Sequence, residues 1–280
     1  MSFDPRRVPA RRDLAAAHLK GEVEADRFVE GRQMAVATAS APLTAHRDPE
    51  AGLASQLLHG ERFTVYDLDD ATGLAWGQAA RDGYVGWVPQ AVLDAPGTPT
   101  HVVTALMTHR YPEPDLKTRP FDMLPFLADV EIVGAEGRWL EVAQGGWVPA
   151  QHLGTERPGG DWVALAEAFL GAPYLWGGKT VSGLDCSALV QLSLHGVGRD
   201  CPRDSDMQEG EMGAEIDPDG GFARGDLVFW KGHVGVMADA DRLLHANGHA
   251  MAVTYEPIVE ARARIEAQGG GPVTTARRLD

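Results

Sequence analysis

Residues 171–190 read GAPYLWGGKTVSGLDCSALV, and this stretch decides the fold of the C-terminal part of the chain. Asp185 is a typical N-cap, because its carboxylate can accept hydrogen bonds from the unpaired amides of a first helical turn. It predicts a helix over Cys186–His195, which Gly196 ends. A cysteine therefore stands at the first position of a helix.

That position indicates a nucleophile. Unpaired N–H groups and the helix dipole stabilise negative charge at a helix start, which favours the thiolate form of Cys186. A thiolate is the attacking group of a cysteine hydrolase. The alternative is a buried, inert cysteine, since free cysteines are commonly buried.

Two histidines could supply the base. His233 begins an apolar strand predicted over Val234–Ala238, and His245 lies in the next predicted strand, Arg242–Ala246. A tight turn around residues 239–241 joins the strands, so both side chains can lie on one side of a sheet. His233 would then take the thiol proton and His245 would orient its ring. The alternative is two unrelated polar residues among the ten histidines of the chain.

The neighbouring segments predict the class of this domain. Asp161 is placed to cap a helix over Trp162–Leu170, which Gly171 and Pro173 terminate. A further strand is expected over Asp226–Trp230. Helices followed by a run of antiparallel strands indicate an α+β domain.

An internal repeat organises the N-terminal half. Gly86–Pro89 (GWVP) recurs as Gly146–Pro149, and His46–Glu50 (HRDPE) recurs as His109–Glu113 (HRYPE). Short segments rich in β-forming residues accompany each copy, and Asp82-Gly83 is a hairpin signal because both residues tolerate a positive φ. Two such units of about sixty residues predict two small β-barrels.

Proline and glycine mark the boundaries: Pro96, Gly97 and Pro99 between the repeats, and residues 157–160 after the second. We therefore predict four parts. These are an N-terminal extension at residues 1–36 with a short helix over Asp13–Leu19, a first barrel at 37–96, a second at 97–157, and the α+β domain at 158–280.

Composition describes a globular protein, with 44% hydrophobic and 23% charged residues in a chain of 280. The net charge of −15 argues against nucleic acid as a partner, because the overall field repels phosphate. The basic group Arg6, Arg7, Arg11 and Arg12 is predicted to be a solvated, poorly ordered tail. No apolar run approaches the ~20 residues that cross a bilayer, so no membrane partner is expected.

The two cysteines form no disulfide framework, and Cys201 is interpreted as a small packed hydrophobe. Met1–Leu14 has no apolar stretch typical of a secretory signal, which predicts a cytoplasmic protein unless a signal precedes the assigned start. His245 and His249 stand four residues apart with no third ligand evident. We therefore expect no metal site, and no cofactor.

Asp161–Asp280 resembles the NlpC/P60 cysteine peptidase family. The resemblance is carried by the motifs Tyr174–Gly178, Asp185-Cys186-Ser187, Gly225–Trp230, His233–Val236 and His245-Ala246. The two repeats look like bacterial SH3 (SH3b) domains, which commonly precede such peptidase domains. Pro202–Ser205 resembles a segment of the subgroup that cleaves murein peptides with a free N-terminus.

This resemblance implies a papain-like α+β fold behind two small SH3-like β-barrels. It also implies a catalytic triad in which Cys186 is the nucleophile, His233 the base and His245 the orienting residue. Tyr174 would lie beside the cysteine and bind or polarise the substrate. Trp176, from the same motif, would also contact the substrate.

The implied reaction is hydrolysis between γ-D-Glu and a diamino acid, diaminopimelate or Lys, in murein peptides that begin with L-Ala. Its implied role is cell-wall peptide recycling. In the subgroup the first SH3b domain closes one end of the cleft, and an ammonium group needs carboxylate and hydroxyl acceptors. The resemblance assigns recognition of the L-Ala amine to Tyr84, Glu61, Asp204 and Ser205, with Ser187 beside them.

Other interpretations stay open. Tyr84 could fill a barrel core, Glu61 could be a solvated charge at a strand edge, and Asp204 could pair with Arg203 or start a helix. The chain could be a peptidoglycan hydrolase of the same class acting outside the membrane, or an enzyme of related acyl-transfer chemistry. It could also be a non-catalytic wall-binding or peptide-binding protein.

Overall fold

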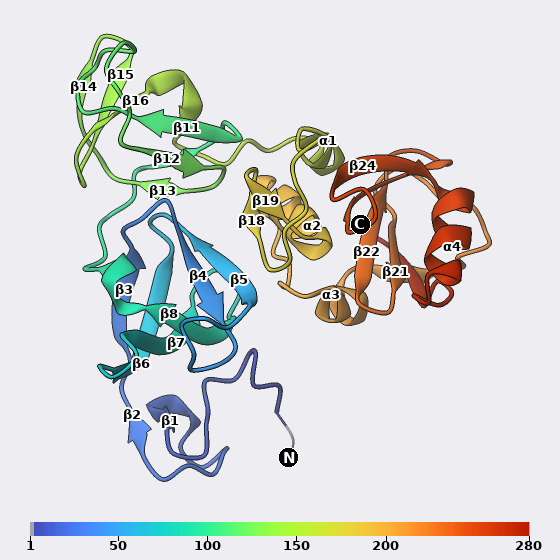
Figure 1. Cartoon of the computed structure of the whole chain (residues 1–280), viewed down its shortest axis with the longest axis horizontal. Helices are drawn as coiled ribbons and strands as arrows, with labels where there is room; N and C mark the ends of the chain where they lie inside the picture. The colour runs from blue at the N-terminus through green and yellow to red at the C-terminus, as the bar shows by residue number, and fades with distance from the viewer. Residues whose placement is uncertain (1–2, 280) are drawn as a thin grey trace. The chain divides into compact units, whose positions relative to one another are not determined.

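The computed structural model describes residues 3–279, which form two compact units that meet in sequence between Glu156 and Arg157 (Figure 1). The first unit is built almost entirely of strands, and the second combines helices with an antiparallel sheet. No helix in this described part of the chain is long and apolar enough to span a membrane.

A seven-stranded sheet forms the centre of the first unit, in the order β5-β4-β8-β7-β6-β3-β9, with every neighbouring pair antiparallel. The predicted turn at Asp82-Gly83 connects β7 to β8, and Gly83 has a φ of +73°. The strands are β3 (Arg32–Val36), β4 (Ser40–Thr44), β5 (Leu53–Leu58), β6 (Arg62–Asp69), β7 (Leu74–Ala79), β8 (Val85–Pro89) and β9 (Leu93–Asp94).

The helix predicted over Asp13–Leu19 is wrong. Ala15–Ala16 is a short strand, β1, that pairs in parallel with β2 (Phe28–Val29), and only Ala17–Leu19 forms a 3₁₀ turn, η1. The amides of Ala15 and Ala16 donate to carbonyls of Arg27 and Pro9. These partners lie outside the four-residue reach of a helix, so the helical hydrogen bonds cannot form.

The prediction of a solvated basic tail is wrong for Arg11, whereas Arg7 and Arg12 are exposed. The Arg11 guanidinium lies 4.4 Å from the centre of the Trp76 ring and 4.9 Å from that of Trp87. Its Nη2 atom is 2.6 Å from Asp67. Leu14 is fully buried in the same cluster as the two tryptophans. Cation–π contacts and burial therefore make this segment a packed part of the first unit.

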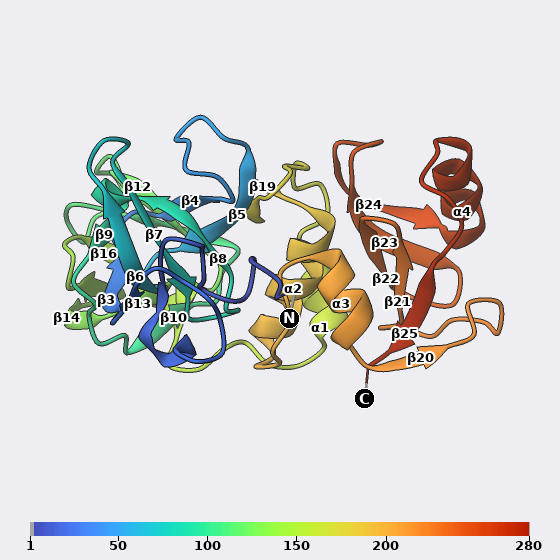
Figure 2. The ribbon, with the colours of Figure 1, turned by 90° about the horizontal axis from the view of Figure 1, so that it is seen from below.

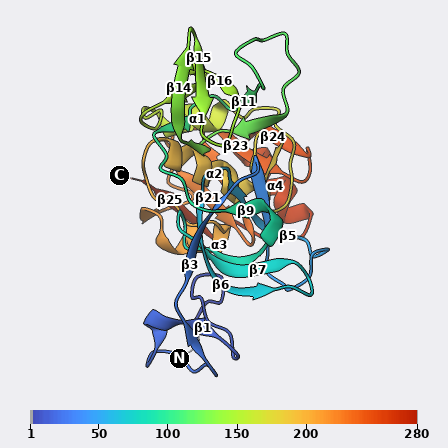
Figure 3. The same ribbon diagram turned by 90° about the vertical axis from the view of Figure 1, so that its left-hand side faces the viewer.

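The second repeat folds into three small sheets around a core that includes Val103, Leu124, Val130 and Val148. Figure 3 shows the antiparallel strands β14, β15 and β16 of this part. Its strands are β10 (His101–Val103), β11 (Met107–Arg110), β12 (Asp122–Pro125), β13 (Asp129–Val130), β14 (Ile132–Glu136), β15 (Trp139–Val142), β16 (Trp147–Pro149) and β17 (Leu153–Gly154); the short 3₁₀ turns η2 (Gln90–Val92) and η3 (Ala150–His152) precede β9 and β17.

The two repeats contact each other through Asp129. Its amide donates to the carbonyl of His59, and its carboxylate lies 2.9 Å from Nη2 of Arg81. The backbone of Gly60 lies so close to that of Asp129 that a Cβ on residue 60 would be 2.1 Å from the carbonyl oxygen of Asp129. Both repeats therefore belong to one compact unit, and the predicted division between residues 96 and 97 stays a prediction.

The second unit has a six-stranded antiparallel sheet in the order β20-β25-β21-β22-β23-β24. Helices α2 and α3 lie on one side of its strands and α4 on the other (Figure 2). Its elements are α1 (Trp162–Glu167), β18 (Lys179–Thr180), β19 (Gly183–Leu184), α2 (Cys186–Gly196), α3 (Ser205–Glu211), β20 (Ala214–Ile216), β21 (Leu227–Trp230), β22 (His233–Met237), β23 (Arg242–Asn247), β24 (Ala252–Pro257), α4 (Ile258–Ala267) and β25 (Thr275–Arg278).

These elements confirm the α+β prediction for the C-terminal part, with one shortened helix. The predicted helix over Trp162–Leu170 ends as α1 at Glu167. The amides of Phe169 and Leu170 bond to carbonyls three residues back rather than four, so the chain tightens into turns before Gly171.

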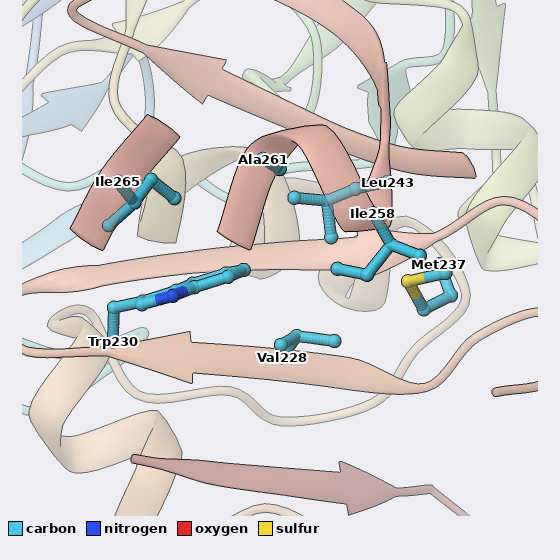
Figure 4. Close-up of a cluster of buried hydrophobic side chains, with 7 residues drawn as sticks. All are labelled: Val228, Trp230, Met237, Leu243, Ile258, Ala261 and Ile265. Carbon is cyan, nitrogen blue, oxygen red and sulfur yellow. The ribbon is translucent and has the colours of Figure 1, made fainter. Parts of the chain in front are cut away.

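A core between the sheet and α4 fixes the face that carries the candidate site. Figure 4 shows Val228, Trp230, Met237 and Leu243 from the strands packed against Ile258, Ala261 and Ile265 of α4. Strand residues on this face alternate with residues facing α2, as the period of a β-strand requires. Burial of these side chains therefore sets the register that brings the two histidines together.

The contact at Gly60 yields a stability prediction. Gly60→Ala should lower the free energy of unfolding by about 1–3 kcal/mol more than Gly73→Ala, because the new methyl group meets backbone. Gly73 is the matched control, since it also has a positive φ but nothing within 4 Å of its added Cβ. Urea unfolding of both variants measures the difference. Equal losses would show that the close approach to Asp129 is not rigid.

Candidate functional site

Asp185 organises the start of α2. Its carboxylate accepts hydrogen bonds from the amide of Ala188 at 2.8 Å and from the amide of Gly177 at 2.9 Å. The first bond confirms the predicted N-cap and begins the helix at Cys186. The second ties the preceding glycine-rich loop to the helix, so a single side chain positions both segments that surround the cysteine.

A buried arginine completes this network, and sequence reasoning missed it. Arg203 is 1% exposed, and its Nη2 and Nη1 atoms lie 2.7 and 2.9 Å from the two carboxylate oxygens of Asp185. Nη1 also donates to the hydroxyl of Ser187 at 2.9 Å. The only sequence signal was the adjacent Asp204, which suggested a neighbouring pair instead of this one across eighteen residues.

Cys186 is buried, with 6% of its surface exposed. Burial raises the pKa of its thiol to about 12, and the charge of Asp185 adds to this effect. Backbone hydrogen bonds from Val234 and Ser187 lower the pKa, as Arg203 does, but by less. The predicted stabilisation of a thiolate by the helix start is therefore outweighed by desolvation. The bond from Val234 also places the sulfur beside the first residues of β22.

His233 and His245 meet on one side of the sheet, as predicted. Nε2 of His233 lies 2.9 Å from Nδ1 of His245, and the ring centres are 5.2 Å apart. Burial lowers the pKa of His233 to about 3 and that of His245 to about 4. Both rings are therefore neutral at neutral pH, and one N–H lies between them.

Behind His245 lies a glutamate–arginine pair that sequence reasoning also missed. Oε2 of Glu256 is 3.2 Å from Nε2 of His245. Arg264 of α4 donates two hydrogen bonds, at 2.8 and 2.7 Å, to the Glu256 carboxylate and so lowers its pKa. Glu256 lies in β24, which pairs with β23 in a hairpin whose register places Glu256 opposite Leu243. That register could not be read from the sequence.

Tyr174 and Trp176 lie on the loop before α2. The amide of Tyr174 donates to the carbonyl of Met251, which joins this loop to the β23–β24 hairpin. Burial raises the pKa of the Tyr174 phenol to about 12, and the negative form of Cys186 raises it further. The phenol therefore keeps its proton as a hydrogen-bond donor. Trp176 is 68% exposed and presents its ring to solvent.

Asp204 and Ser205 stand at the start of α3, where Asp204 occupies the N-cap position. The alternative that Asp204 starts a helix is therefore confirmed. Asp204 and Ser205 are half-buried. The hydroxyl of Ser187 bonds to Asp185 and Arg203 behind the cysteine. Amine recognition by these residues stays a prediction.

Glu61 and Tyr84 belong to the first unit, and both are buried. Glu61 is 2% exposed, so the interpretation as a solvated edge charge is wrong. Its Oε2 accepts a hydrogen bond from the amide of Leu58 at 3.0 Å and lies 3.9 Å from Nε of Arg81. Tyr84 is 5% exposed, which agrees with the barrel-core alternative. Their predicted contact with a substrate amine stays a prediction.

A cavity of about 460 Å³ adjoins His233. It is lined by His233 and Arg264 together with Trp230, Lys231 and Asn247. Within residues 3–279, no group of three or more His, Cys, Asp or Glu side chains is arranged to hold a metal ion. The chemistry that these groups can support is nucleophilic. The thiol is bonded by the amide of Val234, the residue that follows His233 in β22, and the site also holds neutral imidazoles, a tyrosine donor and helix-start amides for a developing oxyanion.

Comparison with known proteins adds two family matches. Residues 171–264 match the model of the NlpC/P60 family, and residues 45–93 match that of the bacterial dipeptidyl-peptidase Sh3 domain. The second match lies in the first repeat, so an SH3 assignment for residues 97–157 stays a prediction. Both matches fall on the segments that the sequence motifs had singled out.

Three relatives illustrate the similarity. A γ-D-glutamyl-L-lysine dipeptidyl-peptidase of Bacillus cereus is 27% identical over 74% of this chain and 71% of its own length. The peptidoglycan endopeptidase RipB of Mycobacterium tuberculosis is 33% identical over 35% of this chain and 47% of its own. The crystal structure of an NlpC/P60 family protein from Bacillus cereus has a TM-score of 0.72 at 19% identity, covering 89% of this chain and 99% of that one.

The buried histidines make stability depend on pH. Their folded-state pKa values lie below the ~6.5 of an unfolded histidine, so the unfolded chain binds protons first as the pH falls. Their contribution is complete above about pH 6.5 and is lost on acidification toward pH 4. His245→Gln should therefore reduce the loss of unfolding free energy between pH 7.5 and 4.5 by about 2 kcal/mol.

Urea unfolding at both pH values measures this loss, with His249→Gln as the control because His249 is exposed. The control should lose as much stability as the unmodified protein. An unchanged pH-dependent loss in His245→Gln would contradict the assignment of a neutral, buried ring.

The Asp185–Arg203 pair yields a second prediction. Asp185→Ala removes a helix cap and leaves the buried Arg203 guanidinium without its main counter-charge, so it should cost about 3–5 kcal/mol of unfolding free energy. Asp219→Ala is the control, because Asp219 pairs with Arg262 at the surface and is 82% exposed. Chemical denaturation should show a much smaller change there. Similar losses in both variants would show that the buried pair does not stabilise the fold.

Proposed function

Because the chain carries an NlpC/P60 domain and a bacterial SH3 domain and is homologous to γ-D-glutamyl-L-lysine dipeptidyl-peptidases, we propose that it is a cysteine endopeptidase acting on murein peptides. The bond cleaved is the amide between γ-D-Glu and a diamino acid, in peptides with a free N-terminal L-Ala. One observation carries the proposal: Cys186 begins a helix beside β22, whose first residue, His233, contacts His245.

The reaction follows from these groups. In the resting site the thiol is protonated and both imidazoles are neutral, so attack requires transfer of the Cys186 proton to His233. The sulfur then bonds to the amide carbonyl carbon, and amides of the first turn of α2 stabilise the oxyanion. The amide of Ala188 is engaged by Asp185, which leaves this role to residues nearer the helix start.

Release of the amine and hydrolysis complete the cycle. His233 returns its proton to the leaving amine as the carbon–nitrogen bond breaks, and then takes a proton from the attacking water. The Tyr174 phenol donates a hydrogen bond to the substrate. The cavity beside His233 offers room for the leaving diamino acid, and Lys231 on its lining can attract a carboxylate.

Two comparisons support the γ-glutamyl specificity. The Bacillus cereus relative is named for γ-D-glutamyl-L-lysine, and the matched SH3 model is named for bacterial dipeptidyl-peptidases. An enzyme that removes a dipeptide must recognise a free amino terminus. In the proposal Asp204, Ser205, Tyr84 and Glu61 serve this recognition, Ser187 lies beside them, and Trp176 contacts the peptide. Recycling of free peptides in the cytoplasm is the part of the proposal that rests on the sequence prediction alone.

A second candidate is hydrolysis of intact wall peptides outside the membrane. The similarity to the peptidoglycan endopeptidase RipB favours it, since that match has a higher identity, 33%, although it covers only 35% of this chain. The chemistry is the same in both candidates. They differ in whether a free amine is required.

A digest of L-Ala-γ-D-Glu-diaminopimelate, with its N-acetylated form in parallel, separates these candidates. Mass spectrometry should show cleavage of the free peptide only, because the acetyl group removes the charge that the carboxylates would bind. Cys186→Ala, which lacks the nucleophile, should abolish cleavage. Asp204→Asn should raise KM for the free peptide and leave the protein folded.

The other outcomes decide against parts of the proposal. Equal cleavage of both peptides would keep the peptidase and remove the amine requirement, which favours the wall-peptide candidate. The absence of cleavage in either peptide would overturn the γ-glutamyl specificity. Cleavage that persists in Cys186→Ala would overturn the nucleophile.

A further inference from the structure

We propose that Glu256, held by Arg264, sets the tautomer of both histidines and thereby makes Nδ1 of His233 the basic nitrogen. This inference rests on the proposed function, because it presupposes that His233 accepts the thiol proton of Cys186. Glu256 acts through His245 and is therefore a positioning residue. It belongs to none of the motifs that carried the sequence predictions.

The contact between the two rings permits two arrangements. A neutral imidazole has one N–H, so across the 2.9 Å contact one ring donates and the other accepts. In the first arrangement Nε2 of His233 donates to Nδ1 of His245, and His245 carries its proton on Nε2. In the second, His245 donates from Nδ1, and His233 carries its proton on Nδ1.

The two arrangements differ in what they offer the thiol. In the first, Nδ1 of His233 has a free lone pair and can accept the proton of Cys186. In the second, both nitrogens of His233 are engaged, one by its own proton and the other by the bond from His245. Only the first arrangement contains a base.

Glu256 distinguishes between them. Its Oε2 lies 3.2 Å from Nε2 of His245. In the first arrangement this nitrogen presents an N–H to the carboxylate, which is favourable. In the second it presents a lone pair to a negative oxygen, which is repulsive in a site with little water. The ionised carboxylate therefore selects the arrangement that leaves the base available.

Arg264 keeps Glu256 in the required form. Its two hydrogen bonds hold the carboxylate in place and favour its ionised state. The charged groups that act on the two rings are Glu256 from β24 and Arg264 from α4, besides the rings themselves. When His233 receives the thiol proton, its Nε2–H still donates to His245, so the new positive charge lies at the end of a relay that terminates in a carboxylate.

Two measurements test this proposal on the full chain without any peptide substrate. Long-range ¹H–¹⁵N correlation spectra of protein labelled with [¹⁵N]histidine report which nitrogen of each ring carries the proton, with His233→Gln and His245→Gln for assignment. At pH 7 the unmodified protein should show both rings protonated on Nε2. The second measurement is the rate of Cys186 alkylation by iodoacetamide between pH 6 and 9.

Glu256→Gln is the decisive variant, because its uncharged amide can accept or donate and so selects neither arrangement. We expect a mixture of tautomers, which halves the share of the competent arrangement. We also expect loss of the negative charge that stabilises protonated His233, so that alkylation is at least tenfold slower in total across this pH range. Glu167→Gln is the matched control: Glu167 is also held by two hydrogen bonds from an arginine, Arg224, in the same unit but away from the histidines. Its alkylation rate should stay within twofold of the unmodified protein.

Several results would overturn the proposal. One is a His233 proton on Nδ1 in the unmodified protein, a result that does not depend on any variant folding. Another is Glu256→Gln with unchanged tautomers and unchanged alkylation. Equal slowing in both glutamate variants would reduce Glu256 to a structural role. If His233→Gln alkylates at the unmodified rate, the base of the proposed function fails while the tautomer assignment stands, so the two failures are distinguishable.

Discussion

The buried ion pair between Asp185 and Arg203 is the interaction on which the candidate site depends. The carboxylate caps α2, holds the amide of Gly177 and neutralises a fully buried guanidinium. Removing charges from water is costly, and the cost is recovered only when every group is well bonded. The pair therefore stabilises one geometry of the loop, the helix start and Cys186 rather than simply adding stability.

The same burial determines the electrostatics of the reaction. Desolvation raises the pKa of Cys186 to about 12 and lowers that of His233 to about 3, so the resting pair is neutral. A helix start alone would favour the thiolate, but its effect is smaller than that of burial here. The proposed reaction then needs a base with a defined tautomer. In our proposal the carboxylate of Glu256 provides this through His245, although it does not contact the thiol itself.

The sheet places these groups through its register. His233 and His245 share the face that packs against α4, and the apolar neighbours on that face, such as Met237 and Leu243, fix which side each strand presents. A slip of one residue would turn both histidines to the opposite face. The geometry of the candidate site is thus a consequence of ordinary core packing (Figure 4), and Arg264 links the helix of that core directly to Glu256.

The first unit shows how local and distant contacts compete. Asp82-Gly83 predicted its hairpin correctly because a turn depends on the two residues that form it. The segment over Asp13–Leu19 was predicted as a helix on local pattern, yet its amides bond to Pro9 and Arg27. Arg11 likewise packs against the protein, because its guanidinium contacts two tryptophan rings and pairs with Asp67.

The sequence by itself determined the elements whose causes are local: the cap at Asp185, the helix from Cys186, the strands that carry His233 and His245, and the α+β class. Only the tertiary structure decided which groups act on them. Arg203, Glu256 and Arg264 lie 18, 11 and 8 residues from their partners Asp185, His245 and Glu256, and reach them through strand register and helix docking. The pKa of Cys186 was decided there too, because desolvation is a property of the packed interior and not of a motif.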